Sequence, residues 1–204
     1  MTSLRHNGFD PHDSSRDPRD LYLDAARACL LDVGWRRTTL TEVARRAGVS
    51  RMTIYRTWAD MPRLLGDLMT REWTGLVETA IAAADPAQPR IQRLVATISA
   101  TVRALRANEL FVRVVELDPE LILPYLLARR GRSQDLILGL IETEIIAGQA
   151  AREVRQGDPT TIARGLLLAA HGFVLSAHTM LDDSVDGPAL DAELALLLSR
   201  GLAA

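Results

Sequence analysis

Residues 39–58 read TLTEVARRAGVSRMTIYRTW, and this stretch decides the fold that we expect for the chain. Thr39 and Glu42 have the spacing of a capping box, in which the Thr39 hydroxyl accepts an early amide hydrogen bond and the Glu42 carboxylate reaches back. The helix that they begin is about two turns long and ends at Ala47-Gly48, because glycine favours helix C-termini. The stretch therefore opens with one short helix and a sharp stop.

A second short helix follows the glycine and runs from Arg51 to about Trp58, with Ser50 placed to cap it. The spacing of Ile54, Tyr55 and Trp58 predicts that these side chains mark its inner side. Two helices joined by a tight glycine turn form a helix-turn-helix unit, whose second helix enters the major groove of DNA. The pattern therefore predicts a DNA-reading element.

The leading end of the second helix carries side chains that suit base recognition. Arg51 and Arg56 offer guanidinium groups, which read guanine with two hydrogen bonds. Met52 and Thr53 offer methyl groups, which can contact the methyl group of thymine. We therefore expect these four residues to face base edges.

Phosphate contacts are expected around the same unit. Thr39 and Ser50 mark helix N-termini, whose free amides attract phosphate, and Arg36 and Arg37 in the preceding loop add positive charge. Tyr55 has two open interpretations, which can hold together. Its hydroxyl contacts phosphate, or its ring packs between the first and third helices.

The charge distribution favours a nucleic-acid partner, although the 204-residue chain has a net charge of −2. All 24 basic residues are arginines. Between residues 36 and 71, eight arginines stand against three acidic side chains, a net charge of +5, while the other residues sum to −7. A basic segment on an acidic chain is typical of a nucleic-acid-binding module attached to another domain, and a solvated helical face is the alternative interpretation.

Helical periodicity extends over the rest of the chain, and no alternating strand pattern is found. Residues 1–16 lack periodicity and are expected to form a disordered arm. Asp17 is placed to cap a first helix that ends at Gly34, and Asp60 to cap a long fourth helix over 61–84. The predicted fold is all-α, with a three-helix helix-turn-helix domain over 17–60 joined by the fourth helix to a helical domain.

The helical domain is expected to span residues 61–204 and to bind an effector and dimerise. Its last two helices, which open at 158–159 and 186–188, are apolar nearly all round and need cover from both sides. The sequence therefore predicts a homodimer through these helices. The leucines that would otherwise face water are Leu190, Leu194, Leu197 and Leu198.

Composition excludes several other classes. The chain is 48% hydrophobic and 25% charged, as an ordinary globular protein is. Its single cysteine, Cys29, lies on an apolar helical face and is interpreted as a small core residue, and one thiol suits a reducing compartment. The N-terminus lacks an apolar signal region, and the most apolar stretch, 165–178, is interrupted by His171. A cytoplasmic protein without a membrane partner is expected.

No cofactor, metal or catalytic site is expected. The sequence contains no nucleophile elbow, phosphate-cradling glycine loop or dinucleotide fingerprint, so an enzyme is not predicted. His171 and His178 lie about 10.5 Å apart along a helix, too far to share one ion within a subunit. A histidine pair across a dimer axis stays open as an alternative to core or interface histidines.

Residues 25–65, AARACLLDVGWRRTTLTEVARRAGVSRMTIYRTWADMPRLL, resemble the DNA-binding domain of the tetracycline-repressor (TetR) family of bacterial transcription regulators. The resemblance rests on Gly34 ending the first helix, on the run T-T-L-x-x-V-A-x-x-A-G-V-S, and on T-I-Y followed by Trp58. It covers about residues 20–70, and the remainder is similar in architecture only. It implies a homodimer that binds a palindromic operator in double-stranded DNA and is released by a small, often apolar, effector.

The resemblance also implies which residues contact DNA. Three positions depart from the family pattern: Met52 is commonly Gly, Trp58 commonly Phe, and Met61 commonly a Lys that touches phosphate. The absent lysine removes one backbone contact, for which Arg56 or Arg63 can substitute. The family contacts map onto Thr39, Ser50, Arg51, Met52, Thr53, Tyr55 and Arg56.

The apolar helices between 91 and 180 are expected to enclose an effector cavity. Glu116 and Glu142 are candidate polar anchors, and the alternative is plain core for the apolar residues and solvated surface for the two acids. A different function also stays open, namely a helical dimer that acts through protein partners and keeps a vestigial helix-turn-helix. The candidate lining residues are Val102, Phe111, Val115, Tyr125, Ile141, Ile145 and His171.

Overall fold

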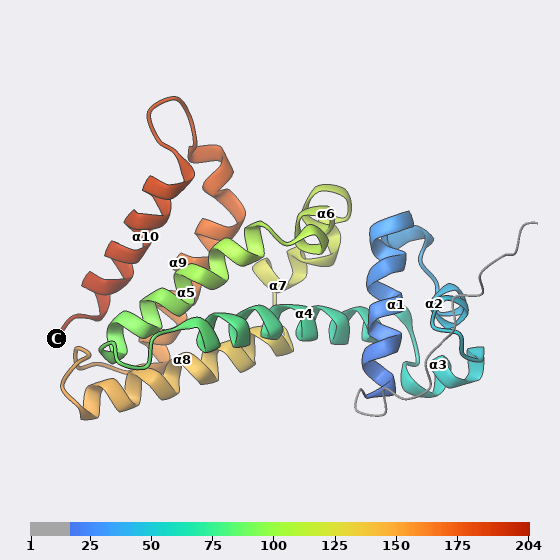
Figure 1. The fold of residues 1–204 in the computed structure, drawn as a ribbon, viewed down its shortest axis with the longest axis horizontal. Helices are drawn as coiled ribbons and strands as arrows, with labels where there is room; N and C mark the ends of the chain where they lie inside the picture. The colour runs from blue at the N-terminus through green and yellow to red at the C-terminus, as the bar shows by residue number, and fades with distance from the viewer. Residues whose placement is uncertain (1–16) are drawn as a thin grey trace, which may run out of the picture. The chain divides into compact units, whose positions relative to one another are not determined.

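The computed structural model describes residues 17–204, and over these residues it confirms the all-α fold (Figure 1). The predicted arm over 1–16 lies outside the described residues. Within them, the only pairing of extended backbone is an isolated bridge between Val154 and Ala203. The α-helices are α1 Pro18–Val33, α2 Leu40–Arg46, α3 Arg51–Thr57, α4 Met61–Ala83, α5 Arg90–Arg106, α6 Glu109–Leu117, α7 Leu123–Leu127, α8 Arg132–Ala150, α9 Pro159–Ser176 and α10 Gly187–Leu202.

The chain divides into two compact units, one up to Leu64 and one from Leu65 onward. The first unit packs α1 against α2 and α2 against α3. Its core includes fully or almost fully buried side chains from all three helices and from Trp58, which follows α3. The Tyr22 ring meets the Trp58 ring edge to face, at 6.3 Å between centroids. The core members are Leu23, Ala26, Cys29, Leu30, Leu40, Val43, Ala44, Ile54 and Trp58.

The helix boundaries of the first unit follow from residues that the sequence identified. The Asp17 carboxylate accepts a hydrogen bond from the Arg19 amide at 2.9 Å, and α1 ends at Gly34, whose φ of 80° suits a glycine. Gly48, with φ 67°, makes the turn between α2 and α3. At the start of α4, Asp60 accepts from the Arg63 amide at 2.8 Å.

In the second unit, α5 packs against α8, α9 and α10, and α8 packs against α9. The core of this unit is aliphatic, and α10 contributes Leu194, Leu198 and Leu202 to it. The prediction that Leu194 and Leu198 face a partner subunit is therefore wrong, because α5 covers them within one chain and leaves them 1% and 2% exposed. Leu190 is half-buried, and Leu197 is exposed.

Helix α9 continues through a short 3-10 turn, and together Pro159–Met180 are long and apolar enough to cross a membrane by length and composition alone. In the structure one side of this helix packs into the core through Ile162, Ala163, Leu166 and Ala170. Its other side is exposed at Leu168.

Candidate nucleic-acid interface and internal cavity

Two side-chain caps fix where the helix-turn-helix begins and turns. The Thr39 hydroxyl accepts a hydrogen bond from the Glu42 amide at 3.2 Å, and the Ser50 hydroxyl accepts from the Thr53 amide at 3.2 Å. The Ser50 and Thr53 hydroxyls are also hydrogen-bonded to each other at 2.9 Å. These contacts hold the first turn of α3, which carries the side chains predicted to contact bases.

An ion-pair cluster stabilises α2 from its outer side. Instead of reaching back to Thr39 as predicted, Glu42 accepts hydrogen bonds from Arg45 Nη2 at 2.6 Å and Arg46 Nε at 3.1 Å. Arg46 also bonds the Asp32 carboxylate on α1. Hydrogen bonds from Arg45 and then Arg46 lower the pKa of Glu42 to about 2. Part of the positive charge of this segment is thus engaged in holding α1 and α2 together.

The residues predicted to contact DNA lie on the surface of the first unit. Thr53 is half-buried and the other eight are exposed. Met52 is 69% exposed, so its side chain is accessible to a partner. The DNA-contact set comprises Arg36, Arg37, Thr39, Ser50, Arg51, Met52, Thr53, Tyr55 and Arg56.

Tyr55 corrects one sequence interpretation. The prediction that it lies on the inner side of α3 with Ile54 and Trp58 is wrong, since its side chain is 49% exposed while those two are buried. Residues 54, 55 and 58 are not on one helical stripe, because adjacent positions differ by about 100° around a helix. The exposed ring leaves the Tyr55 hydroxyl available to phosphate.

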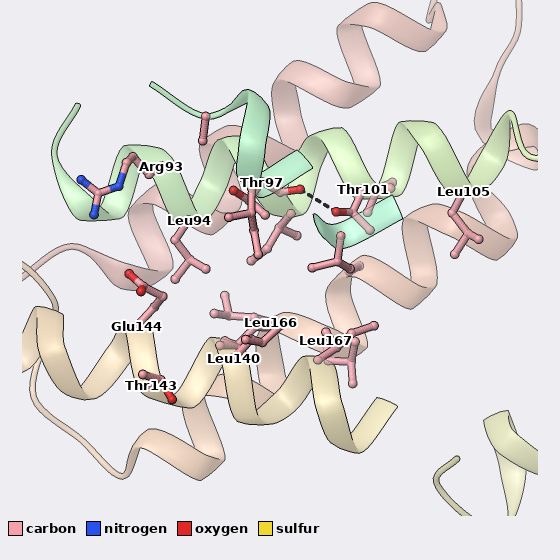
Figure 2. A pocket seen from close by; sticks show the side chains of 18 of the residues that line it. Arg93, Leu94, Thr97, Thr101, Leu105, Leu140, Thr143, Glu144, Leu166 and Leu167 are labelled. Carbon is pink, nitrogen blue, oxygen red and sulfur yellow. Dashed lines mark hydrogen bonds between the residues drawn. The ribbon is translucent and has the colours of Figure 1, made fainter. Parts of the chain in front are cut away.

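The second unit contains a cavity of about 520 Å³ lined by residues of α5, α8, α9 and the last turns of α4 (Figure 2). Helix α5 lines it with Leu94, Ile98, Val102 and Leu105, together with Thr97 and Thr101, and of these six the sequence analysis named only Val102 as a lining residue. The remaining lining residues are Val77, Ile81, Ala84, Pro86, Arg93, Ile137, Leu140, Ile141, Thr143, Glu144, Leu166, Leu167, Ala170, His171 and Val174.

Polar groups on the wall are few. The hydroxyl of Thr101 donates to the carbonyl of Thr97 at 2.8 Å, and Thr143 donates to Gly139 at 2.8 Å. Burial lowers the pKa of His171, so its imidazole is uncharged at neutral pH. Figure 2 shows Arg93 and Glu144 at one end of the cavity and Leu105 at the other.

The structure brings some of the predicted effector residues together and not others. Val102, Ile141 and His171 lie on the cavity wall. Ile145 belongs to the core of the second unit, where its side chain is fully buried. Neither Glu116, which is exposed, nor Glu142, which is half-buried, is among the lining residues.

The other three predicted residues lie on the segment from α6 to α7. Phe111 is buried, and its ring meets the Trp73 ring of α4 edge to face at 5.6 Å. Tyr125 carries the Arg129 guanidinium 5.1 Å above its ring. Val115 is half-buried on α6. None of the three lines the cavity described above.

No group of three or more metal-ligating side chains occurs in the part of the chain that the structure describes. His171 lies on the cavity wall, whereas His178 is exposed beyond the end of α9. The two histidines therefore have different surroundings.

Comparisons with known proteins agree with this architecture. Residues 23–68 match the family described as bacterial regulatory proteins, tetR family. An HTH-type transcriptional regulator of Mycobacterium bovis is 32% identical over 172 residues, which cover 84% of this chain and 87% of the relative. Among solved structures, the transcriptional repressor QsdR of R. erythropolis has a TM-score of 0.65 at 15% identity, covering 91% of this chain and 94% of that one. RolR in complex with resorcinol has a TM-score of 0.66 at 11% identity, covering 91% and 87%.

A capped helix-turn-helix with an exposed reading helix, together with this similarity, defines a transcriptional regulator that binds DNA. The chain belongs to the TetR family of bacterial regulators. The family description covers the DNA-binding unit, and the relative from M. bovis extends the similarity over most of the second unit.

Proposed function

We propose that this protein is a cytoplasmic, ligand-responsive repressor that binds a palindromic operator as a homodimer and leaves it when a small apolar molecule enters the cavity. The observation that carries the proposal is the course of α4. Its first residues belong to the DNA-binding unit, and Val77 and Ile81 near its end line the cavity. One continuous helix therefore belongs to both the reading unit and the cavity wall.

The proposed DNA contacts follow from exposure and chemistry. Arg51 and Met52 project from the first turn of α3, where guanine and thymine edges are within reach in a major groove. Arg37 and the capped N-terminus at Thr39 suit phosphate. In this proposal, side chains of α3 read the bases, and Arg37 together with the N-terminus at Thr39 holds the DNA backbone.

The proposed dimer surface is formed by the outer sides of α9 and α10. Leu168 on α9 is 71% exposed, and Leu196 and Leu197 on α10 are 48% and 54% exposed. Gly165 and Gly172 flank Leu168 at a helical spacing and leave open space above the backbone. An apolar surface of this kind supports packing against an identical copy, and a dimer would read two half-sites together.

Effector release is proposed to act through α4. A ligand that displaces the wall at Val77 or Ile81 biases the position of this helix and thereby the separation of the two α3 helices in a dimer. The RolR structure, named as a complex with resorcinol, supports the idea that this architecture accepts a small organic molecule.

A DNA-binding titration tests the proposal. We expect the full chain to bind DNA flanking its own gene far more tightly than random DNA of equal length, as a dimer by sedimentation. A helical protein-interaction module with a vestigial helix-turn-helix instead predicts weak binding that is equal on both DNAs and lost in salt. Equal affinity for the two DNAs at moderate salt would contradict the proposal that the protein is an operator-binding repressor.

A further inference from the structure

The wall of the cavity is aliphatic. Among its lining residues are fifteen Val, Ile, Leu, Ala and Pro side chains and no Phe, Tyr or Trp. A volume of about 520 Å³ lies within the range of sites for organic ligands. Such a wall recognises its occupant mainly by apolar burial and shape, since it offers no Phe, Tyr or Trp ring for stacking.

The two charged side chains at one end of the cavity are already engaged within the protein. Arg93 donates through Nη1 to the carbonyls of Pro86 and Gln88, at 3.2 and 3.0 Å. Glu144 accepts from Arg90 Nη1 at 2.7 Å. An anionic ligand would meet Arg93 only through the Nε and Nη2 hydrogens that these bonds leave over, and it would also approach the Glu144 carboxylate. A charged head group would therefore meet side chains of both signs at this end and an aliphatic wall elsewhere, so its lost hydration would be only partly replaced.

His171 and Thr97 differ from the other two threonines of the wall. The hydroxyl hydrogens of Thr101 and Thr143 are directed to helix carbonyls. Among residues 17–204, by contrast, no hydrogen bond joins the His171 imidazole or the Thr97 hydroxyl to another group, and of these two the imidazole is the larger. An uncharged imidazole offers one donor and one acceptor, which can bond a hydroxyl or a carbonyl.

We propose that the cavity binds an uncharged, mainly aliphatic molecule that carries a single hydroxyl or carbonyl group, which hydrogen-bonds to His171. The inference rests on the proposed function, since it names the chemical class of the effector. It predicts that carboxylates, phosphate esters and ammonium compounds bind more weakly than uncharged compounds at neutral pH.

Three probes with one alkyl chain and different head groups test the charge requirement: decanol, decanoate and decylammonium. The full chain without DNA is first loaded with phenylnaphthylamine, an uncharged dye that fluoresces in apolar cavities, and each probe is then titrated against it. We expect decanol to displace the dye at a concentration at least about tenfold lower than either ion needs. A binding free energy less favourable by about 1.4 kcal/mol for the charged head group gives that factor. Displacement by decanoate at the same concentration as decanol would overturn the inference.

Matched variants test the site and the histidine. His171→Leu should weaken decanol about five- to tenfold, as the loss of one hydrogen bond does, and His171→Gln, which keeps an uncharged donor and acceptor, should restore it. His178→Leu, outside the cavity, is the control and should bind as the parent does. Ala170→Leu should weaken the binding of both the dye and decanol, because the larger side chain fills part of the cavity. If the binding of both is unchanged, the site lies elsewhere.

The failure of this inference and the failure of the proposed function can be told apart. If decanol binds as expected but does not change the affinity for operator DNA, the proposed ligand class is supported and the proposed ligand-responsive repression is wrong. If decanoate binds the chain and releases operator DNA while decanol does neither, the repressor stands and the ligand class is wrong.

Discussion

The backbone of Gly148 in α8 lies against the side chain of Val154, and no room is left between them for a methyl group. A Cβ on residue 148 would lie 3.2 Å from the Val154 Cβ and closer still to its Cγ2. Val154 is 1% exposed, and its amide donates to the Gly148 carbonyl at 3.2 Å. This contact closes the turn that follows α8, where Val154 also pairs with Ala203.

Replacing Gly148 with alanine should therefore destabilise the chain by about 1–3 kcal/mol, the usual effect of overpacking a buried position. Urea unfolding measures the change. Gly139→Ala on the same helix is the matched control, since a Cβ there meets nothing within 4 Å. It should stabilise the chain by up to about 1 kcal/mol through helix propensity. A similar shift for both variants would contradict the contact.

Arg51 and Arg37 should affect DNA binding in different ways. Arg51→Ala is expected to weaken operator binding by about 1–3 kcal/mol and random DNA much less, because a guanidinium at the start of α3 reads a base. Arg37→Ala is expected to weaken binding to both DNAs alike. It should also lower the slope of log affinity against log salt by about one unit, as the loss of one phosphate contact does. Titrations on both DNAs over a salt series measure this. Equal losses for Arg51→Ala would transfer base reading to Met52 and Thr53.

Aspartate substitutions separate the dimer surface from the core. Leu168→Asp should yield a folded monomer that no longer binds operator, because the side chain is exposed in one chain. Leu194→Asp should instead unfold the second unit, since it buries a charge in the subunit core. Leu127→Asp, at a side chain 80% exposed on α7, is the control. Sedimentation and circular dichroism distinguish these outcomes. If the Leu168→Asp variant is still a dimer, the proposed dimer surface on α9 is wrong.

The ion pairs of Glu42 with Arg45 and Arg46 should make the free energy of unfolding depend on pH. The folded pKa of about 2 lies below the unfolded value of about 4.3, so the stabilisation is present above the unfolded pKa and is lost as pH falls through the folded pKa. Glu42→Gln should lower stability at neutral pH, and the difference from the parent should shrink below about pH 4.3. Glu78→Gln, at an exposed position on α4, is the control. A difference that persists unchanged in acid would contradict the pairing.

Local chemistry predicted the helix boundaries well. Asp17, Thr39, Ser50 and Asp60 each accept a hydrogen bond from an amide of the first turn, as short-range spacing indicated. Residues whose role depends on distant partners were harder to place. Glu42 pairs with arginines rather than with the backbone because bidentate contacts to guanidinium groups lie nearby.

Burial was the property that the sequence could not assign. Leu194 and Leu197 look alike in the α10 pattern, yet α5 covers only the first. The cavity posed the same difficulty, because Thr97 and Thr101 join its wall only through the packing of α4, α8 and α9 around α5. Ile145, which the same periodicity favoured for the wall, is enclosed in the core.

The candidate DNA contacts all lie between residues 36 and 56, and the cavity is lined only by residues from 77 to 174. No side chain serves in both sets. In evolutionary terms, the two sets can diverge separately: under the proposed function, exchange of one aliphatic side chain for another in the wall would retune the chemical stimulus while leaving the recognised promoter unchanged. A lineage could thus acquire a new inducer without rewiring the genes under its control.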